Sequence, residues 1–427
     1  MESGVVALII IGVMMVLYMS ELLPIAVTSV LACIAFAVFG LIPFSAVFAG
    51  FGNDIVFLIA GMIIVGNALF ETGVARMIGK FVISLVGTGE RLFIIAIVIV
   101  STSISLFMSN TATVSIMLPI AASAVHASGG KLTKKNTYMM VGILAVTGGG
   151  LTLIGSTPQL IAQGLLQEGG HETMSFFELS HVGLPVLLLA LLYFLTIGGR
   201  LQKRVFDFPE VEENSENPPA ESEPAESSSG STARMCMSVA ALVFCVIGFL
   251  SDLWTAGVVA MTGAAFCVIS GCISQKAVFR KMDWTTIVIM GCSFGISAGL
   301  DQSGGGRMVA QGVINVLGSN LNPWLLCAAL AFIAVILTNF MSSTATATLL
   351  IPIAVIMATE LGYDVKSIVM SVAIAANIGY ATPISTPPIT MTLAGGYRFM
   401  DYVKVGGLLN LLAYILIVLL FPLMLNV

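Results

Sequence analysis

The chain has 427 residues, of which 58% are hydrophobic and only 9% are charged, and its mean hydropathy is +1.04. So few charges cannot cover so much apolar surface in water, which excludes a soluble globular protein and indicates a polytopic membrane protein. The net charge of −5 is misleading, because eight of the 22 acidic residues lie between positions 207 and 226.

Apolar runs of nearly twenty residues recur along the chain. They predict membrane-crossing helices, since the strands of an outer-membrane barrel would instead alternate apolar and polar residues. The clearest runs are residues 5–19, 25–41, 182–197 and 405–425.

One polar phrase occurs twice. Residues 107–121 read FMSNTATVSIMLPIA and residues 340–354 read FMSSTATATLLIPIA, an offset of 233 at every matched position. Each copy lies between two short apolar arms, which predicts two re-entrant helical hairpins, at about 91–126 and 321–360, with tips buried in protein. Paired polar clusters of this kind are typical of a transporter that builds one central site from two repeats. The alternative is that Ser and Thr merely hold helices together.

A Gly- and Pro-rich stretch follows each hairpin, at residues 148–159 and 377–388. Glycine and proline weaken a helix, so we expect each of these spans to unwind midway and to expose carbonyl oxygens. A simple kink is the alternative interpretation.

Residues 205–233 are rich in Glu, Pro and Ser and nearly free of large apolar side chains. Such a segment predicts a solvated linker, here between an N-terminal membrane repeat, 1–204, and a C-terminal one, 234–427. Further matches at offsets of 231 to 223 indicate a duplicated unit. With five predicted crossings each, ten in all, the two repeats should have inverted topology.

The basic residues predict the orientation of the chain. If the linker is cytoplasmic, 15 of the 17 Lys and Arg residues lie inside, Lys281 among them, and only Arg307 and Lys366 lie outside. Both termini are then exterior. The first hairpin opens to the cytoplasm and the second to the exterior, in a multi-pass protein of the cell membrane.

The tip residues suit the binding of ions. Asn110 and Thr111 are of helix-capping type, so we expect the helix that starts there to present free N–H groups and a positive dipole end, which favour an anion. The exposed carbonyl and hydroxyl oxygens suit an alkali cation. Neither hairpin nor break has a clear mid-membrane carboxylate, so an anionic substrate would balance the charge of the cation, which predicts coupled binding.

One enzyme signature occurs, the G-x-S-x-G at residues 291–295, but all three histidines precede it and it lies within an apolar span. Together with Gly299 it forms a small-residue packing pattern. No P-loop is present in the sequence, so we expect the protein not to be an enzyme.

With these paired motifs the sequence resembles the divalent anion/sodium symporter family of the ion-transporter superfamily, whose hallmark is an S-N-T triplet at each hairpin tip. The resemblance implies an all-α polytopic membrane protein with two inverted-topology repeats, each with a re-entrant hairpin and a broken transmembrane helix. It also implies sodium-coupled symport of di- or tricarboxylates such as succinate, malate or citrate. The carrier would be a homodimer with elevator-type alternating access, with Na⁺ as coupling ion, no other cofactor and no nucleic-acid partner.

The alternatives that stay open are a symporter of sulfate or another oxyanion, a cation/proton antiporter of the same superfamily, and a membrane sensor that binds an anion without transporting it. An antiporter of this kind usually has a titratable carboxylate at membrane depth.

The resemblance also implies site residues by position. Substrate oxygens would meet residues of both tips and both breaks, namely Asn110, Thr111, Ser156, Thr157, Ser343, Thr344, Thr386 and Pro387. The first sodium site would use Ser105, Ser109, Asn110 and Gly155, and the second would use Thr338, Met341, Ser343 and Ser385. Ser343 departs from the family pattern, which has asparagine there, so the second sodium site loses an amide.

Overall fold

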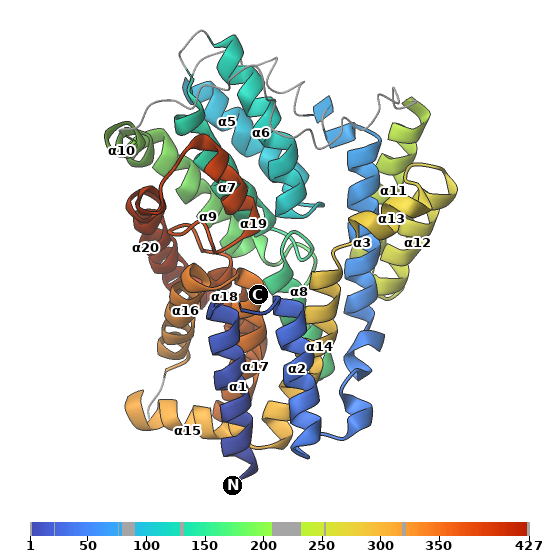
Figure 1. Ribbon diagram of the computed structural model, residues 1–427, viewed down its shortest axis with the longest axis vertical. Helices are drawn as coiled ribbons and strands as arrows, with labels where there is room; N and C mark the ends of the chain where they lie inside the picture. The colour runs from blue at the N-terminus through green and yellow to red at the C-terminus, as the bar shows by residue number, and fades with distance from the viewer. Residues whose placement is uncertain are drawn as a thin grey trace.

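The computed structural model describes residues 2–20, 22–75, 77–78, 90–128, 132–206, 232–251, 253–317 and 322–424, and over these residues it is helical without a strand (Figure 1). Most of the predicted linker, 205–233, lies outside the described residues. So do Arg76, Lys80 and Lys131, which contribute to the predicted orientation.

The N-terminal half begins with three apolar helices and continues with a helix pair and a broken helix. Pro24 precedes α2, and Asn53 caps α3 by accepting a hydrogen bond from the Ile55 amide at 2.9 Å. In order, the elements are α1 (Ser3–Ser20), α2 (Ile25–Val38), η1 (Phe44–Ala46), η2 (Ala49–Gly52), α3 (Asp54–Glu71), α5 (Glu90–Ser105), α6 (Asn110–Ala127), α7 (Lys134–Gly149), α8 (Thr157–Glu168), α9 (Ser180–Tyr193), η3 (Phe194–Gly198) and α10 (Gly199–Val205).

The C-terminal half repeats this order. Its elements are α11 (Thr232–Ser251), α12 (Ala256–Ile269), α13 (Gln275–Lys281), α14 (Trp284–Gln302), α15 (Gly305–Leu317), α16 (Pro323–Phe340), α17 (Ser343–Leu361), α18 (Val365–Ala376), α19 (Pro387–Met391), η4 (Thr392–Gly395) and α20 (Phe399–Met424). Both predicted breaks are present, because α7 and α8 are separated by residues 150–156, and α18 and α19 by residues 377–386.

The described helices include eight that are long and apolar enough to cross a membrane. Four shorter apolar helices accompany them, at Ile25–Val38, Leu92–Ser105, Ala256–Ile269 and Val365–Ala376. The ten predicted crossings are therefore represented only in part by helices of full length, because several spans are broken or shortened.

The two halves interlock. Helix α12 of the second half packs on α3 of the first, and α14 packs on α2. In Figure 1 the pair α5 and α6 lies at one end of the molecule, and the pair α16 and α17 lies in the other half. The re-entrant position of these pairs in a bilayer stays a prediction.

Small residues allow the close packing of α14. A methyl group at Gly291 would meet the ring of Phe51 at 2.6 Å, and one at Gly295 would meet the Cys33 sulfur at 3.0 Å. The G-x-S-x-G segment is therefore a helix-packing surface, as predicted.

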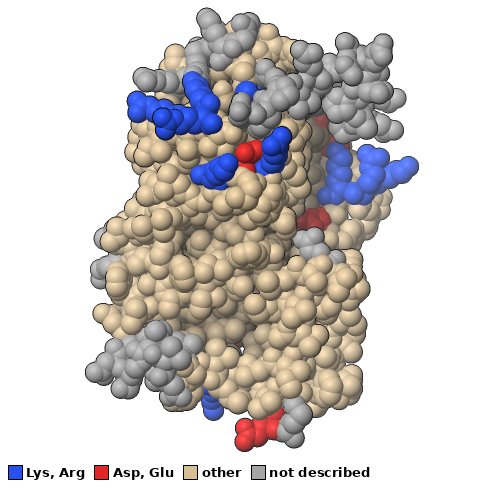
Figure 2. Space-filling model, turned by 60° about the vertical axis from the view of Figure 1, so that its left-hand side comes forward, with Lys and Arg blue, Asp and Glu red and all other residues tan. Residues whose placement is uncertain are grey.

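Lys and Arg side chains gather toward the end of the molecule at which α5, α6 and α10 lie (Figure 2). Far fewer are visible at the opposite end, which is the asymmetry that the sequence predicts. Lys366, one of the two cations expected outside, is buried and paired with Glu172 at 2.6 Å and Glu178 at 2.7 Å.

Candidate functional site

The two hairpin tips and the two breaks meet around one cavity of about 560 Å³. Helices of the first half contribute one part of its wall and helices of the second half another, although they are more than 200 residues apart in sequence. All eight predicted substrate residues lie on this wall, namely Asn110, Thr111, Ser156, Thr157, Ser343, Thr344, Thr386 and Pro387. The structure thus brings together the residues that the sequence analysis selected, and their role in binding stays a prediction.

In each hairpin a serine caps the N-terminus of the second helix, Ser109 for α6 and Ser342 for α17. The Ala112 amide donates to Ser109 Oγ at 3.3 Å, and the Ala345 amide donates to Ser342 Oγ at 3.1 Å. The helix begins at Asn110, close to the expected start near Thr111, but its N-cap is Ser109 and not Asn110 or Thr111. Because serine caps the helix, the side chain of Asn110 is available for other contacts.

The side chain of Asn110 points into a group of oxygens. Ser105 Oγ donates to Ala145 O at 2.9 Å. The side-chain nitrogen of Asn110 donates toward Ser105 Oγ and toward the carbonyls of Ala145, at 3.1 Å, and Gly155, at 3.3 Å. The amide of Asn110 thus connects the hairpin tip to α7 and to the first break.

Glycines make this convergence possible. A methyl group at Gly149 would lie 2.7 Å from Gly155 O and 2.9 Å from the amide carbon of Asn110. Contacts that short are forbidden for a carbon atom, so only glycine allows the break to approach the hairpin tip this closely.

The second half reproduces part of this arrangement. Thr338 Oγ1 donates to Ala376 O at 2.6 Å, the counterpart of the bond from Ser105 to Ala145. The Ser343 amide donates to Ser385 O at 3.0 Å, and Ser385 Oγ donates to Thr382 O at 3.1 Å.

The predicted sodium residues divide into two layers. Ser109, Asn110, Gly155 and Ser343 lie on the cavity wall. Behind the wall, and buried, are Ser105, Thr338, Met341 and Ser385.

Asn377 is a cavity residue that was not among the predicted site residues. Its side chain lines the cavity, accepts a hydrogen bond from Ser156 Oγ and donates to Ala373 O at 3.2 Å. It therefore joins the two breaks across the centre of the site. Repeat matching could not find it, because the residue at the corresponding offset of 231 is Val146. In the sequence, Asn377 is marked only by being a polar residue directly after an apolar run and two residues before Gly379.

Thr386 is different from the other polar wall residues. Its hydroxyl is buried and has no hydrogen-bond partner among the described residues. A buried hydroxyl without a partner is costly, which sets Thr386 apart from the hydrogen-bonded groups around it.

Another part of the wall comes from α3, the end of α13 and the start of α14. It includes Asn67, Lys281, Asp283 and Thr286. From the sequence, Lys281 is expected only to indicate orientation, and Asp283 to lie near the end of a span. The structure places both residues at the cavity.

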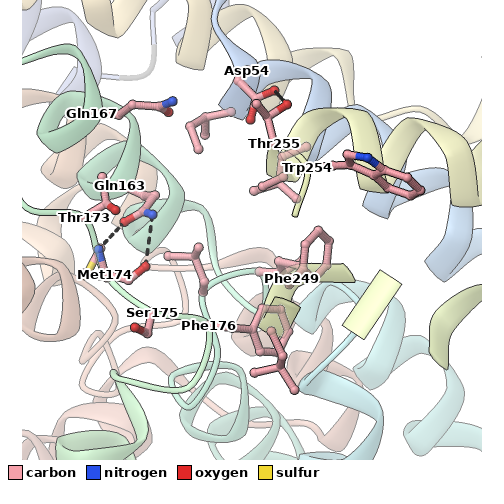
Figure 3. A pocket seen from close by; sticks show the side chains of 16 residues that line it. Asp54, Gln163, Gln167, Thr173, Met174, Ser175, Phe176, Phe249, Trp254 and Thr255 are labelled. Atoms are coloured by element: carbon pink, nitrogen blue, oxygen red, sulfur yellow. Dashed lines mark hydrogen bonds between the residues drawn. The ribbon is translucent and has the colours of Figure 1, made fainter. Parts of the chain in front are cut away.

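A second cavity, of about 300 Å³, lies between α8 and the helices α3, α11 and α12 (Figure 3). Ile154 lines both cavities. Several polar groups here are already paired, since the Gln163 amide bonds to both the N–H and the carbonyl of Met174, at 2.8 and 3.0 Å. Asp54 accepts hydrogen bonds from Thr255 at 2.6 Å and Gly257 at 2.9 Å.

Comparison with known proteins decides the family. The sequence model of the citrate transporter family CitMHS matches residues 14–369. The chain belongs to this family. Family members and relatives are transporters, so the chain is a multi-pass membrane transporter and not an enzyme, of a kind related to the divalent anion/sodium symporters that the sequence resembles.

Curated relatives of similar length agree. The chain is 27% identical to an uncharacterized transporter of Haemophilus influenzae, an alignment that covers 94% of this chain and 88% of the relative. It is 25% identical to the sodium-dependent dicarboxylate transporter SdcS of Staphylococcus aureus, over 94% of this chain and 82% of the relative.

Solved structures share the fold. The YdaH transporter of Alcanivorax borkumensis superposes with a TM-score of 0.62 at 16% identity, covering 88% of this chain and 85% of that chain. MtrF of Neisseria gonorrhoeae gives a TM-score of 0.56 at 14% identity, covering 88% of this chain and 81% of that chain. At such identity the likeness concerns the fold alone.

Proposed function

We propose that this citrate transporter family member is a sodium-coupled symporter of small multivalent carboxylates of the succinate, malate and citrate type. The observation that carries the proposal is the single cavity that both hairpin tips and both breaks line, with the carbonyl oxygens of Ala145 and Gly155 gathered around Asn110 at its first tip. The similarity to a relative named a sodium-dependent dicarboxylate transporter supports the same class of cargo and coupling ion.

The helix ends favour an anion in the cavity. The N-termini of α6 and α17, helices of 18 and 19 residues, begin at the two tips, where their free N–H groups and positive dipole ends attract negative charge. Thr111 and Thr344 lie at these ends and also line the cavity. Hydroxyl and N–H donors at a helix start suit a carboxylate oxygen.

Sodium and the anion would stabilise each other. The oxygens around Asn110 belong to neutral groups, so a cation bound there keeps its full charge in a site of low dielectric constant. A carboxylate in the adjoining cavity offsets that charge. Each ligand therefore raises the affinity for the other, which is the thermodynamic basis of symport.

We infer that transport follows an elevator-type alternating access by a homodimer. The hairpins and breaks would move as one body against α1–α3, α11, α12 and α14, with both termini exterior and the linker cytoplasmic. The concentration of Lys and Arg toward one end supports this orientation (Figure 2).

The rival functions make different predictions. An oxyanion symporter would keep the same ion sites and prefer sulfate. A cation/proton antiporter would need a titratable group, and the only carboxylate on the described cavity wall, Asp283, already accepts hydrogen bonds from Thr286 N at 3.0 Å and Thr286 Oγ1 at 2.6 Å. A sensor would bind the anion without transporting it.

The decisive experiment uses purified protein in liposomes with sodium high outside. We expect labelled succinate or citrate to accumulate inside against its gradient. Preference for sulfate would favour the oxyanion symporter, and binding without accumulation would favour the sensor. Equal accumulation driven by a proton gradient in sodium-free buffer would exclude sodium as the coupling ion.

Two tip variants test the site. Asn110→Ala and Thr344→Ala should each abolish uptake while the thermal unfolding of the protein remains cooperative. Thr262→Ala, an exposed position on α12 away from the cavity, is the matched control and should transport normally. Normal uptake by either tip variant would contradict the assignment of the tips.

A further inference from the structure

Lys281 is the one cation among the described residues of the cavity wall. The tips and breaks contribute only neutral groups to that wall, and the only other charged member is Asp283. The negative charge of Asp283 is engaged at the start of α14, where it accepts two hydrogen bonds from Thr286. Lys281 is thus the one positively charged side chain among the described residues of a cavity that we propose to hold an anion.

The structure holds Lys281 firmly at this position. Its carbonyl accepts a hydrogen bond from Asn67 Nδ2 at 3.1 Å, and its ammonium group pairs with Glu71 and lies 4.9 Å from the centre of the Phe70 ring. All three partners belong to α3. An ammonium group has three N–H donors, so one bond to Glu71 leaves capacity for a second acceptor.

Glu71 is not part of the cavity wall, whereas Lys281 is. The ion pair therefore joins a residue of the cavity wall to one outside it. The side chains of Lys281 and Glu71 are 26% and 25% exposed, so the pair is partly desolvated without being fully buried. Partial desolvation strengthens the attraction of the ammonium group to an anion.

We propose that Lys281 is a specificity-determining residue that binds the second carboxylate of the substrate. One carboxylate of a dianion would occupy the helix starts at the tips, and the other would reach Lys281 across the cavity. A monocarboxylate would gain nothing from this contact. The inference rests on the proposed function and deepens it, because it explains how the carrier selects multivalent over monovalent anions.

Lys281 is the last residue of α13 and belongs neither to a hairpin nor to a break. If the hairpins move as a body, the substrate contacts Lys281 in the arrangement seen here and leaves it in the other. The contact would then make the affinity for a dianion depend on the conformational state.

The test measures binding to the full-length protein in detergent at saturating sodium, by thermal unfolding with succinate and with monomethyl succinate. We expect Lys281→Gln to weaken succinate binding by about tenfold, the loss of one charge-assisted contact. Binding of the monoester and the stabilisation by sodium alone should not change. Lys281→Arg should retain most of the preference for succinate.

Two controls separate binding from a structural ion pair. Glu71→Gln removes the pair but keeps the cation, so succinate affinity should be equal or higher. Lys276→Gln changes an exposed lysine of the same helix, α13, outside the cavity wall, and should have no effect.

The inference is overturned if Lys281→Gln binds succinate as the wild type does. It is also overturned if Lys281→Gln and Glu71→Gln weaken both ligands and the sodium response alike, since that pattern belongs to a structural pair. A wild-type protein that responds to no anion at any sodium concentration would refute the proposed function, and this inference with it.

Discussion

The two hairpin tips arise from the same phrase and yet differ in what they can bind. In both, a serine caps the inner helix, and a hydroxyl from the outer helix donates to a carbonyl before the break, Ser105 to Ala145 and Thr338 to Ala376. At the next position the first tip has the amide of Asn110 among backbone oxygens, whereas the second has Ser343. These contacts are shared by the two halves, and in the proposed sodium sites the change from Asn110 to Ser343 would lower the number of side-chain oxygens and amide groups at the second tip.

This difference teaches that a duplicated site need not be a symmetric one. The second tip lacks this amide, but Asn377 brings an amide to the same cavity from the second break and accepts a hydrogen bond from Ser156 of the first. We expect the first half to dominate sodium binding.

The largest expected effect comes from adding a methyl group next to the first hairpin tip. In Gly149→Ala the new methyl group would overlap Gly155 O and the Asn110 amide, so the oxygens could no longer converge. We expect sodium affinity, measured as sodium-dependent thermal stabilisation, to fall by at least about tenfold. Gly12→Ala is the matched control, since no atom lies within 4 Å of its added methyl group. An unchanged sodium response in Gly149→Ala would disprove the assignment of the first site.

A smaller difference is expected between removing the hydroxyl of Ser105 on α5 and removing that of Thr338 on α16. Ser105 Oγ bonds to both Ala145 O and Asn110, whereas Thr338 Oγ1 bonds to Ala376 O. Loss of one buried partner costs about 1–3 kcal/mol, so Ser105→Ala should weaken sodium binding about tenfold and Thr338→Ala should weaken it less. Thr338→Ser keeps the hydroxyl and should behave as the wild type. Equal losses in both alanine variants would show that the two halves contribute equally.

The smallest effect is expected from restoring the missing amide. Ser343→Asn adds an oxygen ligand at the second tip, and we expect sodium affinity to rise about threefold, less than the gain of a full hydrogen bond to a charged group. Ser342→Asn is the control, because asparagine caps a helix as well as serine does and Ser342 already acts as a cap. A Ser343→Asn protein that folds normally and binds sodium no better would exclude a cation from the second tip.

Repeats and local chemistry were readable in the amino-acid sequence. The twofold phrase predicted both helix pairs and placed their tips together, since a serine, an asparagine and a proline act on the backbone within a few residues of themselves. Glycine and proline likewise predicted breaks within 148–159 and 377–388, and the structure has them at 150–156 and 377–386. The repeat also selected the eight proposed substrate positions, and packing of the two halves brings them to one cavity.

Tertiary structure alone decided which distant side chains face the cavity. Lys281 and Asn377 join the wall through contacts with Glu71 and Ser156, partners more than 200 residues away, and neither residue has a counterpart in the repeat that would reveal it. Spacing along a chain specifies which face of a helix a residue occupies. Which other helix that face meets depends on the packing of the whole molecule. That packing therefore decides that Lys281 lies at the cavity.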